Sequence, residues 1–258
     1  MTNLPASPSA STPPAWQRML TTWAVPVLIG LAYVGLVRTS GVHGWVAVAV
    51  LLVLVVVALL WLMFREMTVH AALSRAAAIG EPDQLQAMAQ AQADRRWTRT
   101  SRMPFQLYVA MSHELRGEWA EALVVLDEVR SVVGLPTRPW GLVAARIEIA
   151  ARLELGDIEA ARTVHAASFA SARPSPGSPA ELFARESAAK LALAEGDPAS
   201  ALPTFVALGA NPRVGPAARS VALLHVARCH DALGDAAAAA TARGVAATLT
   251  PKLWTARA

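Results

Sequence analysis

The sequence lacks most of the features that would point to a catalytic or a disulfide-bonded protein. Its only cysteine is Cys229, so the chain cannot form an internal disulfide framework. Cysteine content therefore does not indicate the cellular compartment of the protein. It contains no glycine-rich phosphate loop, no Cys-x-x-Cys pair, no His-Glu-x-x-His and no Gly-x-Ser-x-Gly. We therefore expect no enzyme activity and no cofactor.

Acidic residues are absent from the start of the chain, where the first one is Glu66. Residues 65–258 carry 21 of the 23 lysines and arginines and all 19 acids, so this part is nearly neutral. Nucleic-acid-binding proteins normally concentrate basic residues on one face. The charge balance therefore argues against a nucleic-acid partner.

Two long apolar runs, 19–37 and 46–64, contain no charged residue. Each would form a helix of about 28 Å, close to the hydrocarbon thickness of a bilayer. We expect a transmembrane helix hairpin over 16–65, preceded by a disordered tail over 1–15 that is rich in Pro, Ser and Thr. A cleaved signal peptide is the alternative for the first run, but that run exceeds the usual apolar length and has a single basic flanking residue.

Basic residues set the expected orientation. Arg18 precedes the first run, Arg38 lies in the short turn, and Arg65 and Arg75 follow the second run. Since cytoplasmic flanks carry the excess of basic residues, both termini are predicted to be cytoplasmic.

Five glycine–acid pairs recur over residues 66–258. They are Gly80-Glu81, Gly117-Glu118, Gly156-Asp157, Gly196-Asp197 and Gly234-Asp235, with spacings of 37, 39, 40 and 38 residues. A glycine ends one helix through a positive φ, and the acid favours the N-terminus of the next helix, so each period predicts a helix hairpin. A hairpin buries its apolar face only against neighbours, and the pattern therefore predicts a stacked array.

The repeat resembles the tetratricopeptide repeat (TPR) family. The likeness is clearest at Gly117-Glu118-Trp119-Ala120-Glu121-Ala122-Leu123, and the family's small packing position is filled by Ala110, Ala189 and Ala227. The resemblance implies an all-α fold in which two transmembrane helices precede a TPR-like α-solenoid of about four to five hairpins. The periods exceed the family's 34 residues. A further departure is expected at Pro203, which should shorten or bend its helix. The second helix of the third unit is expected to cover 158–172.

Family positions that touch a bound peptide map to the first helix of each hairpin. The residues implied here are Leu107, Met111, Arg146, Lys190, Leu224 and Arg228. An equally good interpretation of these positions is ordinary exposed surface with no binding role. The asparagines that clamp a terminal carboxylate in some family members are missing.

Two further clusters are candidates for function. His225, Cys229 and His230 have ligand-like spacing, yet a zinc site needs another close ligand, so we expect a packed cysteine and no metal. The most basic run contains Arg95, Arg96, Trp97, Arg99 and Arg102. If the second run continues as helix to about residue 79 and the chain reverses at Gly80, this run returns to the membrane surface. The alternative is that these arginines complement the C-terminus of a helix and lie in water.

The sequence thus favours a membrane-anchored scaffold that mediates protein–protein interactions at the cytoplasmic face, with a protein partner and the lipid bilayer as its contacts. An assembly or secretion accessory on the exported side, acting as a chaperone of the cell envelope, is the alternative.

Overall fold

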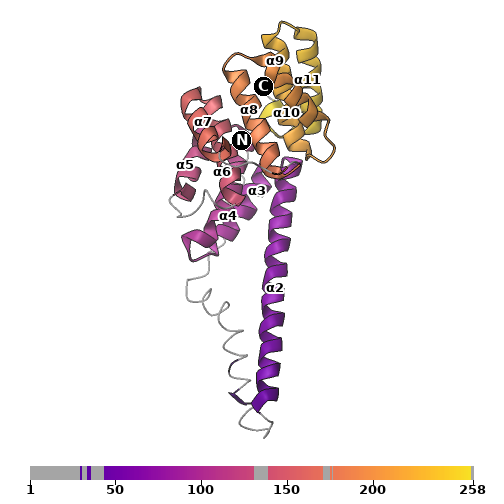
Figure 1. Ribbon diagram of the computed structural model, residues 1–258. Coiled ribbons are helices and arrows are strands. Elements are labelled where there is room, and N and C mark those ends of the chain that lie inside the picture. Colours follow the sequence, from indigo (N-terminus) through magenta and orange to yellow (C-terminus); the bar gives the residue numbers. More distant parts are fainter. Residues whose placement is uncertain are drawn as a thin grey trace, which may run out of the picture. The chain divides into compact units, whose positions relative to one another are not determined.

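The computed structural model describes Gly30, Val34, Gly35 and residues 44–130, 139–170, 175 and 177–256 (Figure 1). The described residues form helices and no strand, which confirms the all-α prediction for this part of the chain. The chain divides into two compact units, Met1–Val69 and His70–Ala258. The predicted tail over 1–15 and almost all of the first apolar run lie outside the described residues.

The helices follow the predicted turns. Their bounds are α2 Gly44–Ile79, α3 Pro82–Asp94, α4 Arg99–Arg116, α5 Trp119–Arg130, α6 Pro139–Glu154, α7 Ile158–His165, α8 Pro179–Ala194, α9 Pro198–Ala210, α10 Pro216–Ala232 and α11 Ala236–Leu249. A π-helical turn, Ala166–Ala170, follows α7, and a 3₁₀ turn, Trp254–Ala256, follows α11.

Helix α2 contains the second apolar run. Its segment Ala49–Ile79, 31 residues long, is long and apolar enough to cross a membrane, and none of its most apolar window is buried. The end of α2 is different, because Leu73, Ala76 and Ala77 are buried in the second unit. One helix of the described residues thus meets the length and composition of a span, and the predicted continuation to Ile79 is confirmed.

The glycine–acid pairs end helices as predicted. Gly80, Gly117, Gly156, Gly196 and Gly234 have φ angles of 78°, 77°, 82°, 87° and 83°. Asp157, Asp197 and Asp235 each accept a hydrogen bond from the backbone N–H three residues later, which caps α7, α9 and α11. Glu118 instead bonds to His113 and Arg116 of the preceding helix.

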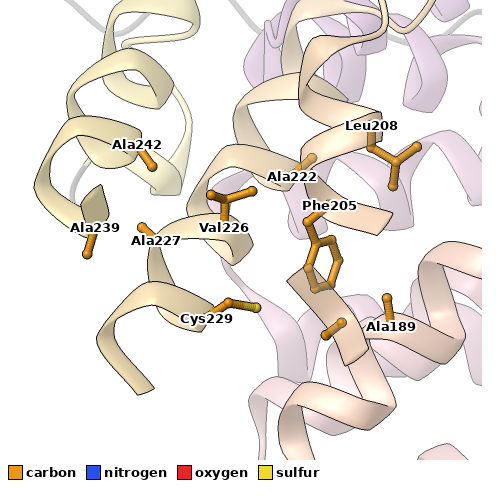
Figure 2. Close-up of a cluster of buried hydrophobic side chains, with 10 residues drawn as sticks. Ala189, Phe205, Leu208, Ala222, Val226, Ala227, Cys229, Ala239 and Ala242 are labelled. Carbon is orange, nitrogen blue, oxygen red and sulfur yellow. The ribbon is translucent and has the colours of Figure 1, made fainter. Parts of the chain in front are cut away.

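Neighbouring helices pack through small residues. Ala122 and Ala161 are fully buried, the first in a cluster with Leu107 and Leu126. Figure 2 shows a second cluster, in which Phe205 of α9 packs among alanines and Cys229. Because alanine has no bulk beyond Cβ, it lets two helices approach closely, as the repeat pattern predicted.

Two predictions concern the second helices of the hairpins. Pro203 lies inside α9 and does not end it, because the helix continues to Ala210 and buries Phe205 and Leu208; a bend at Pro203 stays a prediction. The second helix of the third unit, predicted over 158–172, keeps α-helical winding only to His165 and then widens into the π-helical turn. In α9, burial of the Phe205 and Leu208 side chains offsets the backbone hydrogen bond that Pro203, which has no N–H, cannot donate.

The C-terminal segment returns to the first turn of the second unit. Leu253 is fully buried, and a Cβ placed on Gly80 would lie 3.2 Å from its side chain. Lys252 Nζ lies 2.6 and 2.8 Å from the two carboxylate oxygens of Glu81, 171 residues earlier. The last helices of this unit are therefore tied to its first turn, a contact that the repeat pattern does not predict.

Candidate partner-binding cavity

A cavity of about 710 Å³ lies inside the second unit. The end of α2 lines it together with α4, the start of α5, α6, α8, α9, the loop before α10, α10 itself and the C-terminal turn. Its apolar and aromatic lining includes Tyr108, Met111, Trp119, Trp140, Val143, Phe183, Val221 and Trp254. Ligand sites in proteins commonly have this size and are lined mostly by apolar groups.

Three helices are joined across the cavity wall by buried charges. Arg146 of α6 donates two hydrogen bonds, 2.8 and 2.7 Å long, to the Glu114 carboxylate of α4. On α8, Lys190 donates a 2.6 Å bond to Glu186, whose carboxylate lies 3.9 Å from the Arg146 guanidinium. The four residues form an alternating chain of charge, which we call the inner ion network.

The neighbouring charges of the inner ion network favour the charged forms of Glu186 and Arg146. Burial alone would raise the pKa of Glu186, yet Lys190 and Arg146 hold it below the usual value of a glutamate. Burial likewise opposes the charge of Arg146, but Glu114 and Glu186 outweigh it and raise the pKa of the guanidinium. Glu186 and Arg146 are therefore both charged at neutral pH.

A second ion pair connects helices from different hairpins. Arg228 of α10 donates to both carboxylate oxygens of Glu154, at the end of α6, over 2.5 and 3.0 Å. The same guanidinium lies 5.4 Å from the centre of the Trp254 ring. The arginine thus joins α10, α6 and the C-terminal segment at one point of the cavity wall.

His225 contributes a neutral ring to the wall. It is 5% exposed, stacks on Phe205 with ring centres 4.8 Å apart, and its Nδ1 has no hydrogen-bond partner among the described residues. Burial, with Lys190 and Arg228 nearby, holds its pKa well below the usual value. The imidazole is therefore uncharged at neutral pH.

The six residues predicted to bind a partner divide into two groups. Met111, Arg146, Lys190 and Arg228 line the cavity. Leu107 and Leu224 are 0% and 2% exposed, so they lie in the core and not on the lining. This part of the prediction needs correction.

The reason is that Leu107 and Leu224 lie at the core-facing border of their helix faces, next to residues that line the cavity. Leu107 packs with Ala122 and Leu126, whereas the next residue, Tyr108, begins the lining face that continues at Met111 and Leu115. Spacings of three and four residues starting from Tyr108 would have found this face in the sequence. Trp254 comes from outside the hairpins, and no periodicity indicates it.

The His225, Cys229 and His230 cluster does not converge. Cys229 is buried in the cluster of Figure 2, and burial raises the pKa of its thiol. His230 lies 3.8 Å from Asp235, while His225 faces Phe205. Over residues 44–130, 139–170 and 177–256, no three His, Cys, Asp or Glu side chains are grouped as metal ligands would be.

The basic run predicted to meet the membrane lies between α3 and the first turns of α4. Arg95, Trp97, Arg99 and Arg102 are exposed. Arg96 lies 5.0 Å from the centre of the Phe105 ring, and its carbonyl accepts a 2.7 Å hydrogen bond from Arg102 Nε. Contact between this run and lipid stays a prediction.

Three comparisons were made, with protein family models, with curated proteins and with solved structures, and none of them finds a match to this chain.

Proposed function

We propose that this protein is a membrane-anchored scaffold, in which two spans over 19–37 and 46–64 hold a TPR-like α-solenoid over 66–258 at the cytoplasmic face. The solenoid binds a segment of a protein partner in its internal cavity. No enzymatic step is part of this proposal.

The exposure of α2 supports the membrane anchor. Leu52, Leu60 and Phe64 are 61%, 59% and 67% exposed, and they belong to an uninterrupted apolar stretch. A helix that is apolar all round needs an apolar environment, which a bilayer supplies. Arg65 and Arg75 follow this stretch and favour a cytoplasmic location for what comes after it.

The cavity is the observation that carries partner binding. Its walls come mainly from the first helices of successive hairpins, which is where TPR-like proteins contact their peptides. The inner ion network and the Arg228–Glu154 pair satisfy most of the wall's charges internally. The remaining surface is apolar and aromatic, so it suits an extended segment with apolar side chains better than a strongly charged one.

Partner capture tests the proposal. The full-length chain is purified from detergent-solubilised membranes, unchanged or with Met111→Arg, which places a charge on the cavity wall. Val124→Arg is the matched control, since Val124 is 65% exposed and does not line the cavity. We expect the unchanged chain and the control to retain the same protein and Met111→Arg to lose it. Equal recovery with all three folded chains would contradict the proposal.

Protease treatment of intact and opened cells tests the orientation. Cleavage of the repeat domain only after opening supports the cytoplasmic side. Cleavage in cells with an intact inner membrane supports the exported-side accessory instead.

A further inference from the structure

The C-terminal segment 250–256 is seated on the repeat unit in the manner of a bound peptide. It follows α11, forms only one short 3₁₀ turn, and touches residues that precede it by more than 130 positions. Leu253 packs against Gly80 and Trp254 against Gly117, where an added Cβ would lie 3.1 Å from the tryptophan side chain. Both glycines end helices with positive φ, so each turn offers a surface without a side chain.

Two further side chains pack against the Trp254 ring. Trp119 meets it edge to face, with ring centres 5.3 Å apart and planes at 80°. Arg228 lies over the Trp254 ring from α10, at 5.4 Å. An apolar slot, an aromatic wall and a cation thus surround one tryptophan, and such an arrangement selects for an aromatic side chain.

Some buried polar atoms of the segment form no hydrogen bond with the described residues. Trp254 Nε1 and Thr250 Oγ1 are buried, and neither has a hydrogen-bond partner among the described residues. The Lys252–Glu81 pair is solvent-accessible, with side chains 63% and 32% exposed, so water weakens it. Buried donors without acceptors reduce the stability of a docked segment.

Two contacts hold the segment in place: the buried Leu253 side chain, and a 2.9 Å hydrogen bond between the Thr255 and Ser220 hydroxyls. Its own regular structure is one short 3₁₀ turn, so its release breaks fewer interactions than the opening of a hairpin beneath it.

Trp254 also lines the cavity, as do Trp119 and Arg228. We infer that the surface formed by Gly80, Gly117, Trp119 and Arg228 is a binding site for an extended segment in which an aliphatic residue precedes an aromatic one. Residues 250–256 occupy this site as a built-in competitor, and a partner displaces them. This inference rests on the proposed function, because it names the chemistry of the partner segment and the regulation of the same cavity.

The test is exchange of the segment in trans. A fluorescent peptide of residues 249–256, Leu-Thr-Pro-Lys-Leu-Trp-Thr-Ala, is titrated by anisotropy into the full-length chain and into Trp254→Ala. We expect Trp254→Ala to bind the peptide at least tenfold more tightly, because its own segment competes less. A peptide with alanine at both the Leu253 and Trp254 positions is expected not to bind.

A second variant covers the case in which Trp254→Ala fails to fold. Lys252→Glu places a carboxylate beside Glu81 at an exposed position, so it loosens the segment without disturbing the core. We expect a smaller gain in peptide affinity, roughly threefold. Arg185→Glu is the matched control, because Arg185 is an exposed cation of α8 that forms no ion pair with the part of the chain that the structure describes. The peptide affinity of this variant should equal that of the unchanged chain.

Equal peptide affinity in the unchanged chain, Trp254→Ala and Lys252→Glu would overturn the inference, as would equal binding of the alanine peptide. Partner capture separates this outcome from failure of the proposed function. Peptide exchange without any captured protein leaves the site standing and removes the scaffold. A captured protein without peptide exchange removes only the site.

Discussion

The inner wall and the outer edge of the repeat unit use the same chemical groups in opposite surroundings. On the inner wall, Arg146 pairs with Glu114 and Glu186, and its side chain is 14% exposed. On the outer edge, Arg162 pairs with Glu159 and Glu195, and its side chain is 51% exposed. Both arginines link neighbouring elements of the chain, but only the first is withdrawn from water.

This difference shows that a charged residue on a predicted binding face is not necessarily available to a partner. Each charge of the inner ion network has a partner on the wall, so the network joins α4, α6 and α8. The outer pairs compete with water and contribute less. The inner wall thus contributes stability through its charges and offers a ligand mainly its apolar groups.

The largest expected effect is at Arg146. Arg146→Ala leaves Glu114 and Glu186 buried beside each other without their shared cation, and we expect it to lower the free energy of unfolding by about 3 to 5 kcal/mol. Arg162→Ala is the control on the outer edge and should change stability little. Denaturant unfolding of the full chains, followed by circular dichroism, measures both, and equal losses would remove the distinction between wall and edge.

Ala122 tests the packing beneath the wall. It is fully buried among Leu107, Leu126 and Met103, so Ala122→Leu should overpack the contact of α4 with α5 and destabilise by about 1 to 3 kcal/mol. Ala120→Leu, at an exposed position of the same helix, should melt with the unchanged chain. If Ala122→Leu also melts unchanged, the helix register is wrong.

His225 gives the inner wall a pH dependence. Its pKa is depressed in the folded chain, while the unfolded imidazole takes up a proton near pH 6.5. The stability is therefore fully present above that pH and is lost as the pH falls below it, with a limiting slope of about 1.4 kcal/mol per pH unit. His225→Gln should lose less stability as the pH falls in the same unfolding experiment. An unchanged slope would show that the ring is not held neutral.

The smallest effect concerns the exposed basic run. Arg99→Ala should weaken co-sedimentation of a fragment over 66–258 with anionic vesicles by about 1 kcal/mol, roughly fivefold, at low salt. Arg185→Ala, an exposed cation elsewhere, should bind as the unchanged fragment does. Equal binding to anionic and neutral vesicles would exclude a role for this run at the membrane surface.

The hairpin turns could be predicted from the sequence because each depends on local residues. A glycine with positive φ and an acid beside it determine where a helix ends and the next begins, and Gly117 and Asp157 both behave in this way. The lining was predicted less well. Neighbouring residues of a helix point about 100° apart, so Leu107 faces the core although Tyr108 and the predicted Met111 line the cavity.

Contacts that close the cavity could not be predicted. Trp254 meets Trp119 and Gly117 across more than 130 positions, and no repeat or charge pattern specifies that pairing. The ion pairs of the cavity wall could not be predicted either, because Arg228 and Glu154 are 74 residues apart. Sequence periodicity indicates which residues share a helix face, whereas tertiary closure decides which of them meet.

Site-specific photocrosslinking tests the role of the inner wall most directly. A benzophenone amino acid replaces Met111 on the cavity wall or Val124 on the outer surface of α5, and cells expressing the full chain are irradiated. We predict a discrete crosslinked protein from position 111 and none from position 124. The same product from both positions, or a product from position 124 alone, would contradict binding of the partner within the cavity.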